Sequence, residues 1–135
     1  MGGKLEINHK LVEELVREAL ASRDEICGFL LGRMEGGCFR VCELYKARNV
    51  SLASATSFEM DSGDVYEAHA YAEKRGLDVV GIYHSHPSSP SPSTTDLECM
   101  ERWPVAWLII SSIDGSMAAY IAKRGFVEEL KLQLA

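Results

Sequence analysis

The sequence predicts one α/β domain over residues 1–135, in which two or three helices pack on a mixed β-sheet of about six strands. The 135 residues, 47% of them hydrophobic and 25% charged, match the size and composition of one folded domain. Short apolar runs of strand length alternate with amphipathic segments of helical period. The sequence contains no repeat, low-complexity tail or charged linker that would divide it. These observations indicate a single core.

The first predicted elements are a helix and a hairpin. Asn8 can cap a helix with an apolar stripe at helical spacing, which the polar residues 22–24 end. Residues 26–32 form a nearly all-apolar run, which is typical of a strand buried on both faces. Turn residues at 34–37 join it to a partly alternating strand over 38–46, so we expect the two strands to form a hairpin.

A second helix is predicted after a polar loop. Residues 48–56 are small and polar, and a short extended piece at 58–60 leads out of this loop. Asp61 or Ser62 can cap the helix that follows, because both side chains accept hydrogen bonds from main-chain N–H groups. Gly76 ends this helix.

A third, short helix is predicted between two strands. An apolar strand over 78–83 leads into a loop rich in serine and proline over 87–92. The helix begins after Ser93 and ends at Pro104, which cannot continue it. A strongly apolar strand over 105–113 follows.

The last segments complete the sheet. A turn at 114–116 leads into a strand over 117–123. The tail over 126–134 fits a helix as well as a strand, since its apolar residues recur at helical spacing and its leucines also recur at every second residue. We favour the strand.

Charge and apolar content exclude two classes of function. The formal net charge is −6 and no run of Lys or Arg exceeds two residues, so we expect no nucleic-acid binding through a basic patch. The longest apolar stretch, residues 105–110, is far shorter than the about 20 residues of a membrane span. The N-terminus lacks the apolar segment of a signal peptide, which predicts a cytoplasmic protein.

The four cysteines are expected to be free thiols. They show no CxxC spacing, and Cys38 and Cys42 are a weak metal signal because they lie on a strand without a matching pair of histidines. A reducing cytoplasm keeps such thiols reduced, and the alternative is an intracellular disulfide of the kind found in thermophiles. The four positions are Cys27, Cys38, Cys42 and Cys99.

The most informative segment carries two histidines at the end of a predicted strand. His84 and His86 lie two residues apart, so on an extended chain they point the same way, about 6.6 Å apart along the strand. Asp96, in the first turn of the next helix, is well placed to be a third ligand. Two histidines and a carboxylate leave one tetrahedral position open, which is the catalytic arrangement for zinc.

Each of these residues also has a role that needs no metal. A His-x-His pair on a strand is more often an exposed surface feature than a site. Ser93 and Asp96 match a helix capping box, in which each side chain accepts a hydrogen bond from the other residue's main-chain N–H. Capping and metal binding can coexist, because a carboxylate has two oxygens. Ser85, between the histidines, is interpreted as a packing position.

At this point the sequence resembles the JAMM (MPN-plus) zinc metalloproteases, in particular their minimal archaeal and bacterial type. The resemblance rests on His84-Ser85-His86-Pro87 followed by Ser93 and Asp96, and it extends over about residues 8 to 123. Residues 24–32 resemble the family's segment with the catalytic glutamate, and residues 58–61 resemble the segment before its second helix. The family pattern has seven residues between the second histidine and the serine, whereas this chain has six. The resemblance implies an MPN-like sandwich similar to that of cytidine deaminases.

The resemblance also implies roles for individual residues. His84, His86 and Asp96 would bind Zn²⁺. Glu25 would act as the general base on a zinc-bound water, and Ser93 would stabilise the oxyanion on the scissile carbonyl group. Asp24 is as suitable as Glu25 by composition, but adjacent residues on a strand face opposite ways.

The function implied is that of a zinc-dependent metallopeptidase or isopeptidase similar to a deubiquitinase. It would hydrolyse the bond after the C-terminal Gly-Gly of a ubiquitin-like or sulfur-carrier protein, whose extended tail can add beside an exposed sheet edge. Two alternatives remain. One is a non-catalytic MPN scaffold that binds partner proteins, and the other is a peptidase that trims a sulfur carrier in cysteine biosynthesis. The sequence leaves open whether the chain forms a homodimer.

Overall fold

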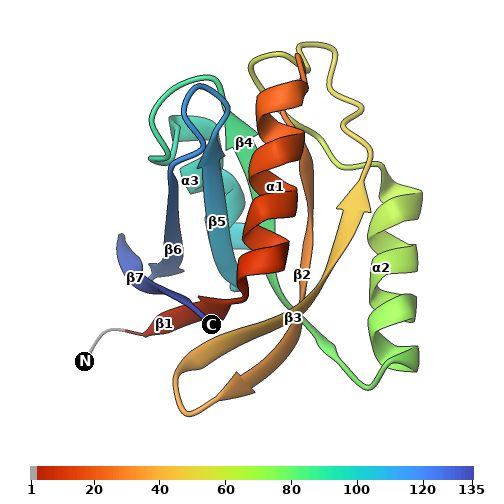
Figure 1. Ribbon diagram of the computed structural model, residues 1–135, viewed down its shortest axis with the longest axis vertical. Coiled ribbons are helices and arrows are strands. Elements are labelled where there is room, and N and C mark those ends of the chain that lie inside the picture. Colours follow the sequence, from red (N-terminus) through yellow and green to blue (C-terminus); the bar gives the residue numbers. More distant parts are fainter. Residues whose placement is uncertain (1–2) are drawn as a thin grey trace.

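Within residues 3–135, the sheet contains seven strands and closes on itself, with three helices packed around it (Figure 1). The computed structural model describes residues 3–135. In chain order the elements are β1 (Lys4–Ile7), α1 (His9–Ala21), β2 (Cys27–Glu35), β3 (Cys38–Ala47), α2 (Ser62–Lys74), β4 (Asp78–His86), α3 (Thr94–Arg102), β5 (Ala106–Ser111), β6 (Met117–Lys123) and β7 (Phe126–Leu134). The predicted class of an α/β fold with a mixed sheet is confirmed.

The strand order around the sheet is β1-β3-β2-β4-β5-β6-β7, and pairing of β1 with β7 closes it. Three pairs are parallel, namely β1 with β3, β1 with β7, and β4 with β5. The other neighbours are antiparallel, which includes the predicted hairpin of β2 and β3. Closure leaves no strand free over its whole length, but β3 pairs with β2 alone beyond Arg40. That stretch of β3 therefore offers an exposed edge of the kind that we expected.

The predicted number of about six strands was one too low, because β1 was missed. Leu5 and Ile7 of β1 are fully buried and alternate with more exposed neighbours, but four residues are too few for a reliable period. The tail forms strand β7, as favoured, and it is held on both sides by β6 and β1. The extended piece at residues 58–60 makes only one isolated bridge, between Met60 and Asn49.

Helix boundaries follow the predicted caps closely. The Asn8 side chain accepts a hydrogen bond from the N–H of Leu11 at 3.0 Å, and Asp61 rather than Ser62 caps α2. Ser93 caps α3. These short polar side chains satisfy N–H groups that have no partner inside a helix, which is why the three helices begin where they do.

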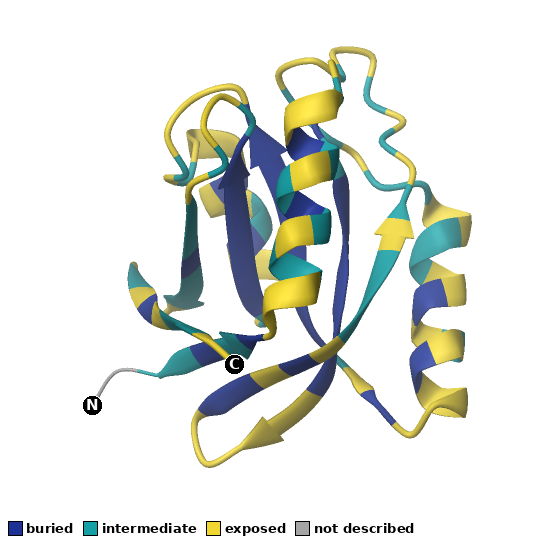
Figure 2. Cartoon of the chain, viewed as in Figure 1, coloured by how far each residue is buried: buried dark blue, intermediate teal, exposed yellow. Residues whose placement is uncertain are grey.

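The strands β2, β4 and β5 form the buried centre of the fold, and Figure 2 shows them buried along most of their length. Helix α1 covers one face of this centre, and α2 and α3 cover the other. On the first face, Leu15 of α1 packs in one apolar cluster with Leu30, Tyr83, Leu108 and Ile110 of the strands, among others. On the opposite face, Ala68 of α2 and Met100 of α3 pack in a second cluster with Phe29, Ile82 and Trp107 of the strands, among others. Burial on both faces explains the all-apolar runs in the sequence.

The described part of the chain contains no helix long and apolar enough to cross a membrane. Its four cysteines are free, with Cys27 and Cys38 buried and Cys42 exposed.

Candidate metal centre

Four polar side chains that the sequence singled out are buried together at one end of the central strands. Glu25, His84, His86 and Asp96 are each between 0% and 6% exposed. Strand β4 runs three residues further than predicted and ends at His86, so both histidines lie within the regular ladder. They extend the face of β4 that packs against α2 and α3. Burial of this many ionisable groups requires partners for their charges.

The two imidazoles and the Asp96 carboxylate lie close enough to share one ion. The Nε2 atoms of His84 and His86 are 3.1 Å apart. The Oδ1 atom of Asp96 is 3.1 Å from Nε2 of His84, and its Oδ2 atom is 2.8 Å from Nε2 of His86. A tetrahedral metal ion with bonds of about 2.0–2.1 Å holds its ligand atoms about 3.3 Å apart. These donor atoms therefore fit around a single metal ion.

Glu25 belongs to the same cluster although it comes from a different element. It lies just before β2, and its carboxylate has an oxygen within 4.8 Å of ligand atoms on both histidines. Its neighbour Asp24 is exposed and accepts a hydrogen bond from the Ser54 hydroxyl at 2.8 Å. The two adjacent carboxylates thus face different surroundings, although both residues precede β2 and lie outside the strand on which we expected them.

Asp96 caps its helix and faces the histidines at the same time. The N–H of Ser93 donates to Oδ2 of Asp96 at 2.9 Å, and the N–H of Asp96 donates to the Ser93 hydroxyl at 3.1 Å. The predicted capping box is therefore present. The loop that is one residue shorter than the family pattern still brings Asp96 within 3.1 Å of both imidazoles.

The environment separates the pKa values of the two carboxylic acids. Burial raises the pKa of Glu25 to about 7, while the attraction of His86 lowers it and the charge of Asp96 raises it. Burial also raises the pKa of Asp96, but hydrogen bonds with His84 and His86 outweigh this and hold it well below its ordinary value. At neutral pH, Asp96 is ionised and Glu25 is near its point of half-protonation.

The two histidines differ in the same way. Burial lowers the pKa of His84, which favours the neutral imidazole that a metal ion binds. The hydrogen bond to Asp96 raises the pKa of His86, and burial opposes this less strongly. A neutral His84 and an ionised Asp96 form a donor set suited to a divalent cation.

Aromatic packing holds His84 in place. Phe58 stacks on its ring with centroids 4.5 Å apart, and Trp107 presents a ring at 5.9 Å and 84°. The Nδ1 atom of His84 is buried without a hydrogen-bond partner among residues 3–135. Ring packing thus fixes the orientation that a hydrogen bond to the second nitrogen fixes in many metal sites.

A narrow cavity of about 140 Å³ opens onto the cluster. Several of the residues that line it were not predicted as functional, because they come from the irregular loop before α2 or from the exposed side of α3 and show no periodic pattern. The lining residues are Glu25, Thr56, Ser57, Phe58, His86, Ser93, Thr95, Asp96 and Cys99.

Ser85 was interpreted as a packing position, and the structure adds a hydrogen bond to this role. The side chain is 1% exposed, but its hydroxyl oxygen accepts a hydrogen bond from the N–H of Ile26 at 2.8 Å. It therefore connects β4, which carries the histidines, to the residue that follows Glu25.

The end of β4 is fixed by a separate contact. The N–H of Ser112 donates to the carbonyl oxygen of His86 at 2.7 Å.

Comparison with known proteins agrees with this arrangement. Residues 8–122 match the family described as prokaryotic homologs of the JAB domain. A desampylase of Pyrococcus furiosus is 38% identical over 119 residues, which cover 87% of this chain and 81% of that protein. A probable TtuB-protein conjugate cleaving protease of Thermus thermophilus is 35% identical over 71 residues, or 52% of this chain and 47% of that protein.

Solved structures give the same result for the fold. The solution structure of a protein from Desulfitobacterium hafniense superposes with a TM-score of 0.86 at 29% sequence identity, over 97% of this chain and 92% of that one. The sequence match covers every segment that contributes to the metal centre, from Glu25 to Asp96. The chain therefore belongs to the family of prokaryotic homologs of the JAB domain, as its resemblance to the JAMM metalloproteases implied.

Proposed function

We propose that this protein is a zinc-dependent protease that hydrolyses the bond after the C-terminal tail of a ubiquitin-like or sulfur-carrier protein. The observation that carries the proposal is the buried set of two imidazoles and two carboxylates with different pKa values at a narrow cavity. The kinship with a desampylase and with a conjugate-cleaving protease supports it. The whole described fold acts in this proposal as one metalloprotease domain.

The histidines and Asp96 are the proposed zinc ligands. Nitrogen and carboxylate donors suit Zn²⁺, and three protein ligands leave a position for substrate or water. When bound, such an ion supplies a Lewis acid and a water of lowered pKa, which provides a nucleophile at neutral pH. Asp96 is the better ligand of the two carboxylates because it is ionised and contacts both imidazoles.

Glu25 is the proposed general base. It takes a proton from the attacking water and returns it to the nitrogen of the leaving amine, so the scissile C–N bond is replaced by a carboxylate and a free amine. A base works best when its pKa lies near the working pH, and burial raises the pKa of Glu25 to about 7. This carboxylate also opens onto the cavity where the substrate carbonyl would lie.

Ser93 is the proposed donor to the oxyanion on that carbonyl. Its oxygen already accepts a hydrogen bond from the N–H of Asp96, and a hydroxyl group has one proton left to donate. The residue also lines the cavity. Its capping role and its catalytic role are compatible because they use different atoms of the same hydroxyl group.

The small volume of the cavity supports a substrate that ends in glycines. A volume of about 140 Å³ has room for an extended main chain without side chains, which suits a Gly-Gly tail. Residues of β3 beyond Arg40 pair only with β2 and offer such a tail a free strand edge that leads toward Cys27 and the site. Both a ubiquitin-like modifier and a sulfur carrier present a tail of this kind.

The test uses two purified substrates, a linear fusion and a lysine-linked conjugate, each built on a ubiquitin-like protein that ends in Gly-Gly. The zinc-loaded protein is expected to cleave at least one of them after the second glycine. Chelation should abolish cleavage and added zinc should restore it. A protein that holds one zinc per chain and cleaves neither substrate would instead be a non-catalytic scaffold.

A further inference from the structure

Glu25 lies outside the strand ladder, so its main chain needs other partners to fix its position. Strand β2 begins at Cys27, two residues later. All four main-chain polar groups of Glu25 and Ile26 are nevertheless bonded. The N–H of Glu25 donates to the carbonyl oxygen of Ser54 at 2.7 Å, and the N–H of Ser85 donates to that of Ile26 at 3.0 Å. The other two groups are held by side chains, those of Asn49 and Ser85.

The Asn49 side chain holds Glu25 and the loop beside it together. Its amide nitrogen donates to the carbonyl oxygens of Glu25 at 2.9 Å, Ser57 at 3.0 Å and Ser54 at 3.3 Å. Its amide oxygen accepts from the N–H groups of Ser51 and Glu59, both at 3.1 Å. The Asn49 side chain thus uses both its donor nitrogen and its acceptor oxygen. All of these bonds fix the loop that places Ser57 and Phe58 in the cavity wall.

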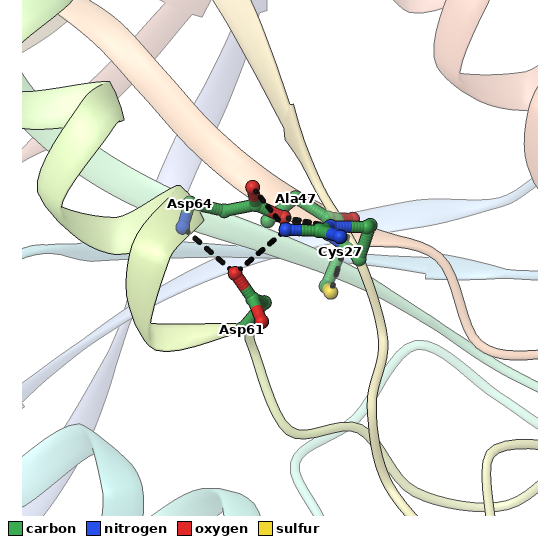
Figure 3. A network of polar contacts seen from close by, with 5 residues as sticks. Cys27, Ala47, Asp61 and Asp64 are labelled. Carbon is green, nitrogen blue, oxygen red and sulfur yellow. Dashed lines mark hydrogen bonds and ion pairs between the residues drawn. The ribbon is translucent and has the colours of Figure 1, made fainter.

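The base of this loop is closed by further contacts around Asn49. The N–H of Asp61 donates to the carbonyl oxygen of Arg48 at 3.1 Å. The Arg48 side chain bonds Asp61 at 2.9 Å and Asp64 at 3.1 Å, which ties the end of β3 to the start of α2 (Figure 3). Next to these ion pairs, the Cys27 thiol donates to the carbonyl oxygen of Ala47. Asn49 therefore acts inside a segment whose two ends are already fixed.

Ser85 approaches from the opposite side. It lies between His84 and His86 on β4, so its side chain points away from theirs, toward the start of β2. Its hydroxyl and its N–H both bond the main chain of Ile26. The strand that carries the histidines is thereby locked to the residue next to Glu25.

We propose that Asn49 and Ser85 are positioning residues that set the Glu25 carboxylate against the histidine pair. This proposal rests on the proposed role of Glu25. A general base displaced by about 1 Å can lose about 10²-fold in rate even when every catalytic group is still present. Fixing the main chain on both sides of Glu25 prevents such a displacement.

Two variants remove these contacts and a third serves as a control. Asn49→Asp keeps the size and an accepting oxygen but turns an acceptor toward three carbonyl oxygens. Ser85→Ala deletes the partner of the Ile26 N–H. Asn8→Ala removes an asparagine that also accepts a main-chain hydrogen bond, at the start of α1. The Asn8→Ala variant should be less stable, but the contacts that position Glu25 should be unchanged.

We expect kcat to fall about 10- to 100-fold in Asn49→Asp and Ser85→Ala, with one zinc retained per chain. KM should stay within about threefold in Ser85→Ala, because the cavity wall is untouched, and Asn8→Ala should keep the wild-type rate. In a Glu25→Gln background, either substitution should change the residual rate by less than about twofold. A full additional loss in that background would show that the two residues do not act through Glu25.

Amide hydrogen exchange in the metal-free protein tests the contacts without activity. Exchange should accelerate at least tenfold at Glu25 in Asn49→Asp and at Ile26 in Ser85→Ala, whereas Asn8→Ala should accelerate it only at the start of α1. Unchanged exchange at both sites would overturn the positioning proposal. If exchange changes as expected but the wild-type protein cleaves no conjugate, the positioning contacts are supported and the proposed function is wrong.

Discussion

The histidine side and the glutamate side of the cavity are built by different means. His84 and His86 lie on β4, whose pairing with β2 extends to His84 and whose pairing with β5 extends to His86, so strand pairing sets the positions of their main chains. Glu25 and the loop over residues 48–61 lie outside the named strands, and side chains of Asn49 and Ser85 supply a large part of the hydrogen bonds that hold their main chains. The main chain of the proposed base is thus held by contacts that single substitutions can remove, whereas the main chains of the two histidines are held by strand pairing that such substitutions leave in place.

The largest expected effect comes from the histidine side. His84→Ala should abolish zinc binding and lower turnover by at least about 10³-fold, because a buried ligand is lost from a set of three. The exposed His9 is the matched control, and His9→Ala should keep one zinc per chain. Elemental analysis of both variants checks this. Full zinc retention in His84→Ala would assign the metal to other residues.

Chelation also tests the histidine side, because it removes the metal ion and leaves the proposed ligands in place. Removal of the metal should abolish turnover and leave the far-ultraviolet circular dichroism spectrum unchanged, because two apolar clusters on either face of the sheet hold the fold. Zinc added back should restore activity. Loss of the spectrum on chelation would indicate a metal with a structural role.

On the glutamate side, Glu25→Gln should lower turnover by about 10²–10⁴-fold while one zinc stays bound. It removes the proposed base and leaves the three proposed ligands in place. Asp24→Asn is the control, since that carboxylate is exposed and bonds Ser54. An inactive Asp24→Asn together with an active Glu25→Gln would reverse the assignment of the base.

Ser93 lines the cavity and caps α3, and its variants distinguish the capping role from the proposed catalytic role. Loss of the cap in Ser93→Ala should lower the free energy of unfolding by about 1 kcal/mol. Loss of an oxyanion donor should lower kcat up to about 10²–10³-fold. Ser93→Asp can still cap α3 but places a negative charge near the oxyanion, so it should be stable and nearly inactive. Normal turnover in both variants would leave Ser93 with its capping role alone.

The smallest expected effect is a pH dependence of stability in the metal-free protein. Because the pKa of Glu25 is about 7 when folded and near 4.5 when unfolded, the unfolded state releases this proton first as the pH rises. The free energy of unfolding should therefore fall between about pH 4.5 and pH 7 through this group. Glutamine does not ionise, so Glu25→Gln should not show this fall in the free energy of unfolding. The variant should be more stable than wild type at pH 8, by roughly 1–3 kcal/mol.

Urea unfolding of both proteins at pH 4 and pH 8, in the presence of a chelator, measures this difference. The two proteins should have nearly equal stability at pH 4. A gap that is larger at pH 4 than at pH 8 would contradict the raised pKa of Glu25.

The sequence was informative where structure is local. Asn8, Asp61 and Ser93 identified the helix starts, and the His-x-His pair identified the centre of the site. Glu25 was chosen by resemblance to a family, since periodicity only separated it from Asp24. Asn49 and Phe58 could not be predicted, because their contacts depend on how an aperiodic loop folds back onto β2 and β4.

Closure of the sheet by the first and last strands has a consequence for biosynthesis. Lys4 of β1 pairs with Lys131 of β7, so β1 gains its second neighbour only after all the other strands of the sheet have been synthesised. The helices and the hairpin of β2 and β3 can form while the chain is still emerging, but the sheet cannot close before β7 leaves the ribosome. A nascent chain stalled before residue 126 would therefore expose both lateral edges, and it depends on prompt completion to avoid pairing with other chains.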